Sequence, residues 1–499
     1  MTEGWHRLSG WSVLYFIFRF LRQLVANIFA LIPAIYGITR IENVQIGIAI
    51  GVASAFVVTL YAVMQYLYFR YQVTDDAILV REGVFFRKQV NLGFERIQNL
   101  SLDRPFYFRP LSLITLKADG TGSTGEEVNL AALSEPEATR IHDHIRTARE
   151  IASASVHAED ANETGVVTEG GEAFLIDREL GHLVLHGLTN NRAWIALAAI
   201  GACFGQFADP LRDYVAGLGI DFSAMLVDAT ITMFIVLAVS ALVLSIIIVT
   251  SLSILGSIFA YYGYELTGSR TRLTVQRGLL NHRTTYMKKS RVQASHYQQD
   301  WLDRVFGRLN LVFEQVSHQA TNELDSNSRL VVPSVTMPQA NHLTQEIVSV
   351  DDPATYDYQG VSLRLLARNL AITLMVCTSL VMGLHIADIG PLSALPIPFS
   401  LWVGLLQYYQ WKRLGITVEG NLAIVRKGTI GIHYTVIELH KLQFVRLSQT
   451  PFMRRSQLSS LVLTVASRTL VVPFLAQQFA EAVRDYGLYQ AEARERSWM

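Results

Sequence analysis

Long apolar runs alternate with shorter strand-like runs three times along this chain of 499 residues. A helix needs about 20 mainly apolar residues to cross the hydrocarbon core of a membrane. Six segments meet this need and form three closely connected pairs: 22–38 with 44–69, 192–207 with 225–262, and 366–386 with 391–411. The pattern therefore predicts six transmembrane helices in three pairs.

Each pair is followed by several short strand-like runs and a final helical pattern, which are typical of a small β-sandwich or barrel capped by a C-terminal helix. In the first segment Ser134 and Glu137 have the spacing of a helix capping box. We expect an interfacial helix with the first span pair (1–70), a sandwich (71–150), an acidic linker (151–177), an interfacial helix with the second pair (178–262), a sandwich (263–350), a linker with the third pair (351–411) and a sandwich (412–499).

Basic residues beside the spans lie mostly on one side of the predicted membrane. That side has Arg7, Arg19, Arg22, Arg70, Arg178, Arg192, Arg270, Arg272, Arg364, Arg368, Lys412 and Arg413. The short connections on the other side have only Arg40 and Arg212 as bases. Cytoplasmic loops carry an excess of Lys and Arg. Both termini and all three sandwich segments are therefore predicted to be cytoplasmic.

A short motif recurs in the three sandwich segments with constant spacing. Each copy has an apolar residue, two mostly polar residues and a glycine, which is Gly83, Gly278 or Gly428. Thirteen residues later comes a basic residue, then an aliphatic residue and a glutamine: Arg96 to Gln98, Arg291 to Gln293, and Lys441 to Gln443. Identical spacing in three copies indicates an internal repeat.

The basic residue and the glutamine of this motif are two positions apart, so on a strand they would point to the same face. One interpretation is a polar pair that contacts anionic headgroups or a partner protein. The other is structural: an amide side chain has donors and acceptors that satisfy backbone groups at a bend. The structural interpretation is favoured, because it explains why every copy has the motif.

Composition narrows the class of protein. The chain is 51% hydrophobic with a mean hydropathy of +0.28, which favours a membrane protein. Lys+Arg and Asp+Glu both number 42, so net charge gives no indication of a nucleic-acid partner. Cys203 and Cys377 stand far apart in apolar runs, which indicates neither a disulfide framework nor a metal site.

Catalytic and cofactor motifs are not evident. We find no Ser-His-Asp set, paired carboxylates or phosphate loop, so we expect no enzyme activity, no cofactor and no metal. The spacing Gly120-x-Gly122-x-x-Gly125 imitates a dinucleotide loop, but a strand-like run follows it instead of a helix. It is therefore predicted to be a hairpin connection. His182 and His186 have helical spacing but lack a third ligand nearby.

A basic cluster in the second sandwich segment is a candidate contact for anionic lipid headgroups. It comprises Arg283, Lys288, Lys289 and Arg291. A basic residue held near an anionic leaflet contributes about 1 kcal/mol. The alternative is a solvated face or the ordinary positive bias of cytoplasmic segments.

The span pair followed by these landmarks resembles the second group of bacterial pleckstrin-homology-like domains, once catalogued as a domain of unknown function. "YQVT" at 71–74 and "YELT" at 264–267 fit its pattern, whereas "RLGIT" at 413–417 lacks the tyrosine. The chain is similar to the large membrane proteins of that family with three such domains. The resemblance implies a seven-stranded sandwich closed by a C-terminal helix, no established enzymatic activity, and a smaller single-domain relative as a partner.

These observations together predict a non-enzymatic multi-pass protein of the bacterial cytoplasmic (inner) membrane. Its three cytoplasmic PH-like domains would form a scaffold or envelope-maintenance module that binds proteins and anionic lipids. The expected partners are membrane lipids and either further copies of the chain or a smaller single-domain relative. An exporter-like protein that moves a lipid or amphipathic peptide, and so protects against membrane-active compounds, is the alternative.

Overall fold

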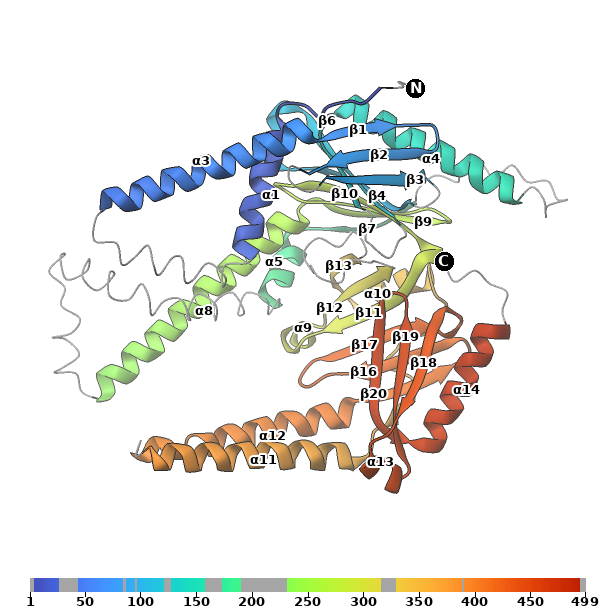
Figure 1. Ribbon diagram of the computed structural model, residues 1–499. Helices are drawn as coiled ribbons and strands as arrows, with labels where there is room; N and C mark the ends of the chain where they lie inside the picture. The colour runs from blue at the N-terminus through green and yellow to red at the C-terminus, as the bar shows by residue number, and fades with distance from the viewer. Residues whose placement is uncertain are drawn as a thin grey trace. The chain divides into compact units, whose positions relative to one another are not determined.

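The computed structural model describes residues 4–26, 44–83, 87–94, 97–120, 127–157, 173–189, 231–315, 329–387 and 390–493. The chain divides into two compact units. The first contains Met1–Glu169, Asp177–Glu265 and Val275–Tyr286, and the second contains Gly170–Ile176, Leu266–Thr274 and Met287–Met499. Figure 1 labels most of the elements used below.

Each predicted sandwich segment folds as six strands followed by a helix (Figure 1). Repeat 1 has β1 (Arg70–Val73), β2 (Ala77–Glu82), β3 (Lys88–Gly93), β4 (Ile97–Arg104), β5 (Leu113–Gly120), β6 (Glu127–Ser134) and α4 (Glu135–His157). Repeat 2 has β8 (Tyr264–Gly268), β9 (Arg272–Arg277), β10 (His282–Lys288), β11 (Val292–Gln299), β12 (Leu309–Gln315), β13 (Arg329–Val335) and α10 (Met337–Gln345). Repeat 3 has β15 (Gly415–Glu419), β16 (Leu422–Lys427), β17 (Ile432–Glu438), β18 (Leu442–Ser448), β19 (Leu458–Val465), β20 (Arg468–Ala476) and α14 (Gln477–Ala493). The predicted strand-rich domains closed by a helix are confirmed.

The strands of a repeat divide between two sheets, and consecutive repeats share a sheet. Strands β1-β2-β3 form one three-stranded sheet, and β18-β19-β20 form another. The two seven-stranded sheets have the orders β6-β5-β4-β10-β9-β8-β7 and β13-β12-β11-β17-β16-β15-β14. The second half of one repeat therefore continues into the first half of the next.

An additional short strand precedes the helices that lead into repeats 2 and 3. Strand β7 (Ala173–Arg178) lies beside β8, and β14 (Gln359–Gly360) pairs with β15 through Gln359 opposite Ile416. In repeat 1 an isolated bridge joins His6 to Tyr71 in the same way. The expected linker at 151–177 is therefore wrong at both ends, because α4 extends to His157 and β7 begins at Ala173. The helices before repeats 2 and 3 therefore lie, along the chain, between two neighbouring strands of one sheet.

The helices bear out the apolar pattern in part. Those before the repeats are α1 (Ser12–Ala26), α3 (Val44–Tyr68), α5 (Leu180–Thr189), α8 (Ile231–Tyr261), α11 (Leu363–Ile386) and α12 (Pro396–Arg413). Among the described residues two stretches are long and apolar enough to cross a membrane, Val239–Tyr261 and Leu363–Ile386. Most of the predicted spans 22–38 and 192–207 falls outside the described residues. Six spans remain a prediction.

Helices α11 and α12 pack against each other and against repeat 3. Gln407 donates a hydrogen bond to Thr373 Oγ1 at 2.8 Å between the two helices. At the sheet, Trp411 Nε1 donates to the Val361 carbonyl at 3.1 Å, and Arg413 Nη1 donates to the Gly431 carbonyl at 2.8 Å. The C-terminal end of α12 is therefore hydrogen-bonded to the sandwich.

Helices α5 and α8 approach each other closely through small residues. A Cβ atom at Gly187 would lie 2.5 Å from the Ile254 Cα atom. Ser253 Oγ donates to the Gly187 carbonyl at 2.6 Å, and Ser257 Oγ donates to the Leu183 carbonyl at 2.8 Å. Small residues that allow close backbone approach are characteristic of helix packing in membranes.

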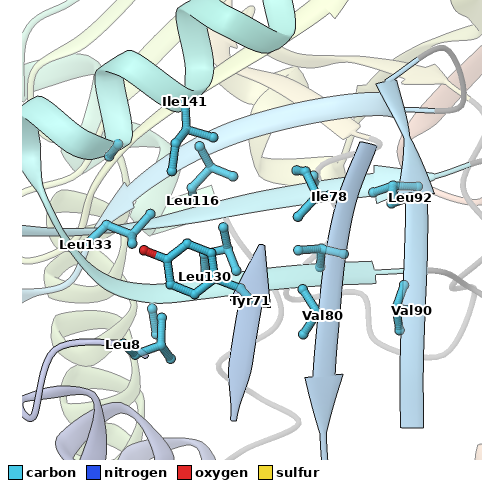
Figure 2. Packing of buried hydrophobic residues seen from close by; sticks show 14 of the residues in the cluster. Leu8, Tyr71, Ile78, Val80, Val90, Leu92, Leu116, Leu130, Leu133 and Ile141 are labelled. Carbon is cyan, nitrogen blue, oxygen red and sulfur yellow. The ribbon is translucent and has the colours of Figure 1, made fainter. Parts of the chain in front are cut away.

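The core of repeat 1 lies between its strands and α4 (Figure 2). Ile78, Leu92, Leu116 and Leu130 are fully buried in it. Burying such a side chain contributes roughly 1.5–3 kcal/mol. The Tyr71 hydroxyl donates to Glu137 Oε1 at 2.8 Å, and burial, together with this carboxylate, raises the pKa of Tyr71. The helix is thereby joined to the first strand.

One left-handed backbone position recurs just before the fifth strand of each repeat. It is occupied by Ser112 (φ 51°), Gly307 (φ 61°) and Gln457 (φ 50°). A side chain costs about 1–2 kcal/mol in this conformation, and the greater freedom of unfolded glycine offsets part of that. Because Gln457 is exposed, we expect Gln457→Gly to stabilise repeat 3 by about 0.5 kcal/mol. Thermal unfolding of the full chain measures this, and Ser456→Gly, at φ −108°, should destabilise instead.

Candidate interaction edges at the repeat boundaries

The boundary between repeats 1 and 2 is an antiparallel pairing of β4 with β10. Arg104 lies opposite His282, and Asp103 lies opposite Arg283. Asp103 is 3% exposed. Its carboxylate is 2.9 Å from Lys117 Nζ within repeat 1 and 3.2 Å from Arg283 Nε of repeat 2. A buried carboxylate thus holds one cation from each side of the boundary.

The boundary between repeats 2 and 3 pairs β11 with β17 and has its own buried carboxylate. Glu314 on β12 lies 2.8 Å from Arg329 Nε of repeat 2. Arg468 of repeat 3 contacts both carboxylate oxygens, at 2.8 and 2.9 Å. Planar guanidinium groups favour such two-point contacts with carboxylates. Glu314 therefore connects the two repeats.

His296 extends this cluster across the paired strands. Its Nε2 lies 3.0 Å from Glu314 Oε2, and its Nδ1 lies 3.0 Å from the hydroxyl of Thr435, the residue opposite it on β17. A neutral ring with its proton on Nε2 faces the carboxylate and accepts from the hydroxyl. One histidine thereby contacts both the buried carboxylate and the neighbouring repeat.

The pKa values at this boundary follow from burial and the two arginines. Burial lowers the pKa of His296, and Arg468 and Arg329 lower it further against the opposing effect of Glu314. Burial alone would raise the pKa of Glu314, but contacts with His296 and the two guanidinium groups lower it to about 2. At neutral pH the cluster is a carboxylate, two guanidinium groups and a neutral imidazole.

The depressed pKa of His296 predicts that acid weakens this boundary. Below the ordinary histidine pKa of about 6.5 the unfolded chain binds a proton that the folded chain does not. Stability is therefore lost as pH falls through about 6.5. We expect amide hydrogen exchange of β11, corrected for the intrinsic rate, to rise from pH 7.5 to 5.5, by at most about tenfold for one titrating group. His296→Gln should remove most of this rise, whereas His342→Gln, at an exposed position on α10, should leave it in place.

Both boundaries use the same register. Positions are counted here from the motif glycine of each repeat, which is Gly83, Gly278 or Gly428. The residue 21 positions after this glycine lies opposite the residue 4 positions after the glycine of the next repeat: Arg104 opposite His282, and Gln299 opposite Ile432. The pairing is therefore a property of the repeat, which joins a fourth strand to the third strand of the following copy.

The third strand of repeat 1 and the fourth strand of repeat 3 have no partner from another repeat among the described sheets. Strand β3 corresponds to β10 and β17, and it is the end strand of its sheet. Strand β18 corresponds to β4 and β11, and it is also an end strand. The difference is visible at the motif glutamine, since Gln293 on β11 is 2% exposed whereas Gln443 on β18 is exposed. Among the described strands, repeats 1 and 3 thus each present one open edge.

The motif glycines have backbone conformations that favour glycine. Gly83, Gly278 and Gly428 have φ angles of 110°, 110° and 151°. A Cβ atom would lie 2.0 Å from the Asn281 carbonyl oxygen at Gly278 and 2.2 Å from that of Gly431 at Gly428. The recurrence of glycine therefore has a steric cause.

The remaining motif residues are placed differently from the sequence expectation. Arg291 and Lys441 are the last residues of short 3-10 turns that precede the strands. The expectation that the basic residue and the glutamine lie on one strand and point to the same face is therefore wrong for these two copies. Arg96 lies outside the described residues. The strand register shifts at Gln98, Gln293 and Gln443 alike, which places each glutamine at a bulge. Lys441 is 5% exposed and donates to the Val292 carbonyl at 2.7 Å across the second boundary.

The four candidate lipid contacts are not equally available. Arg283 is paired with Asp103, as described above, and Lys289 Nζ is paired with Glu346 at 2.9 Å. Arg291 is half-buried, and burial lowers its pKa. Lys288 is exposed. Lipid contact remains a prediction, and Lys288 is the exposed one of the four.

The predicted hairpin at the glycine spacing is confirmed, because β5 and β6 are antiparallel neighbours with Asp119 opposite Glu127. Residues 121–126, including Gly122 and Gly125, lie outside the described part. Within the described ranges no group of three or more His, Cys, Asp or Glu residues could hold a metal. His186 packs edge-on against the Tyr261 ring at 5.2 Å.

Comparison with known families agrees with this repeat structure. A family model described as "Bacterial PH domain" matches residues 18–149, 222–349 and 365–491, which is more than half of the chain. The chain belongs to the bacterial PH domain family. The resemblance inferred from the repeat motif is thus confirmed. Each bacterial PH domain match includes helix residues before a sandwich and all six of its strands.

One relative in this family is similar along most of its length. The UPF0699 transmembrane protein YdbT of Bacillus subtilis (strain 168) is 21% identical over 457 residues, which cover 89% of each chain. Its name agrees with the two span-length apolar helices found here.

The boundary residues Asp103, His296 and Glu314 are not among those predicted from the sequence. Each lies in a strand, and none belongs to the recurring motif. A signal was nevertheless present, because Glu314 interrupts the apolar run "LVFEQV" at 311–316. A charge in a buried strand requires a partner.

Proposed function

We propose that the chain is a non-enzymatic scaffold of the bacterial cytoplasmic membrane, with several spans and with both termini and three bacterial PH domains in the cytoplasm. The observation that carries the proposal is the pairing of consecutive repeats through shared sheets and buried carboxylates. Such pairing joins consecutive repeats in sequence and leaves strand edges for proteins to bind. The exposed apolar surface of α8 and α11 suits a lipid environment.

The test is purification of the tagged full-length chain from native membranes with mild detergent, followed by mass spectrometry of proteins and lipids. We expect a retained protein partner and an enrichment of anionic lipids. A matched preparation of Lys288→Glu should lose part of the lipid enrichment and keep the protein partner, because Lys288 is exposed and each basic residue near the leaflet contributes about 1 kcal/mol.

A clean monomer without any retained protein would contradict the scaffold. Loss of protection against membrane-active compounds on changing apolar residues within α8 or α11, with all protein partners retained, would favour the exporter-like alternative instead.

A further inference from the structure

The two open edges are the two halves of the contact that already occurs twice within the chain. Strand β18 is a fourth strand without the third strand of a following repeat, and β3 is a third strand without the fourth strand of a preceding repeat. Unpaired edges present a row of backbone donors and acceptors to any strand that fits them. The backbone groups of such an edge do not by themselves distinguish a following copy in the same chain from one in another chain.

We propose that β18 of one chain pairs with β3 of a second copy of the chain, antiparallel and in the register of the internal boundaries. This proposal deepens the scaffold proposal and rests on it. Transfer of the common register places Ser448 opposite Lys88 and Phe444 opposite Leu92. The contact is head-to-tail: each chain contributes β18 to one neighbouring chain and β3 to another.

The side chains at these edges are compatible with the pairing. Ser448 and Lys88 take the places of Asp103 and Arg283, which lie opposite each other at the first boundary. Both are exposed, and no two like charges fall directly opposite each other in the transferred register. Such like-charge pairs would be destabilising.

Phe444 gives a specific reason to expect an occupant on β18. Its counterpart at the second boundary is Ala294, which lies opposite Ile437 and joins the hydrophobic core of repeat 3. Phe444 itself is 53% exposed on the open edge. A second copy would place it opposite Leu92 of repeat 1. Large exposed apolar side chains on an edge strand favour strand addition.

Disulfide trapping between two differently tagged full-length chains tests the contact in membranes. Both chains carry Cys203→Ala and Cys377→Ala; one also carries Ser448→Cys and the other Lys88→Cys. Directly opposite residues on paired strands have Cα atoms roughly 4.5–5.5 Å apart, which a disulfide can bridge. We expect one major cross-linked species that contains both tags.

The control for register uses Ser448→Cys with Gln89→Cys. Adjacent residues point to opposite faces of a strand, so this pair should cross-link at least about tenfold less. Phe444→Glu should reduce the Ser448–Lys88 cross-link at least about fivefold, as expected for a buried charge. Tyr489→Glu, at a site that is 64% exposed on α14, should not reduce it.

Absence of the two-tag species, equal cross-linking of the shifted pair, or a dominant Lys88→Cys homodimer would each overturn the proposal. Occupation of β18 by a smaller relative would also abolish the two-tag species. The scaffold proposal is judged separately by the native-membrane purification. Retained protein partners without the cross-link would contradict self-pairing alone, whereas the cross-link without other partners would leave self-pairing in place.

Discussion

Replacing Glu314 by Gln is expected to open the boundary between repeats 2 and 3. The carboxylate is 3% exposed and contacts Arg329, Arg468 and His296. Removing one partner of a buried ion pair leaves the other charges uncompensated, which typically costs 3–5 kcal/mol. Because the two arginines are about a third exposed, we expect the lower end, about 3 kcal/mol.

Amide hydrogen exchange of the full-length chain in detergent measures this loss directly. Exchange in β11 and β17 should increase about 100-fold, since 1.4 kcal/mol corresponds to a factor of ten. Glu346→Gln is the matched control, because the Glu346 side chain is 42% exposed where it pairs with Lys289. Surface pairs contribute about 1 kcal/mol or less. Similar exchange in both variants would show that the buried cluster does not hold the boundary.

Replacing Gly278 by Ala is expected to destabilise repeat 2 by about 3 kcal/mol, through backbone strain and a clash with the Asn281 carbonyl oxygen. The φ angle of 110° is one that alanine rarely adopts. A lower midpoint of thermal unfolding and faster exchange in β10 are the measurements.

Gly307→Ala separates the clash from the general cost of a left-handed residue. At Gly307 the φ angle is also positive, but a Cβ atom would meet nothing within 4 Å. We expect a loss of about 1 kcal/mol there. Equal losses at Gly278 and Gly307 would mean that the close carbonyl is not what keeps glycine in the motif.

Much of the fold could be predicted from local patterns. The apolar runs around α8 and α11 have the length and composition of spanning helices, and the constant spacing from Gly83 to Gln98 recurs in each domain. The alternation of apolar and polar residues in the strands and the helical pattern after them were sufficient to predict the architecture of the domains. These properties depend on neighbouring residues in the chain, which a sequence displays directly.

The repeat boundaries could not be predicted in the same way. Alternation along a strand indicates which face is buried, but not which strand lies at its edge. Asp103 and Arg283 are far apart in sequence, and nothing near either residue indicates the other. The strand β7 was missed because "AFLIDR" is short and borders a polar stretch. The lipid cluster illustrates the same limit, since Arg283 and Lys289 are paired within the chain.

Because the helices before repeats 2 and 3 lie along the chain between two neighbouring strands, a chain of this kind can gain or lose a domain together with its helices. In repeat 3, the chain leaves the sheet at β14, passes along α11 and back along α12, and re-enters the sheet at β15. A duplication that begins at such a strand and ends at the closing helix adds a whole domain together with its helices. The chain end then stays at the same end of the helices, whether a protein has one copy or three.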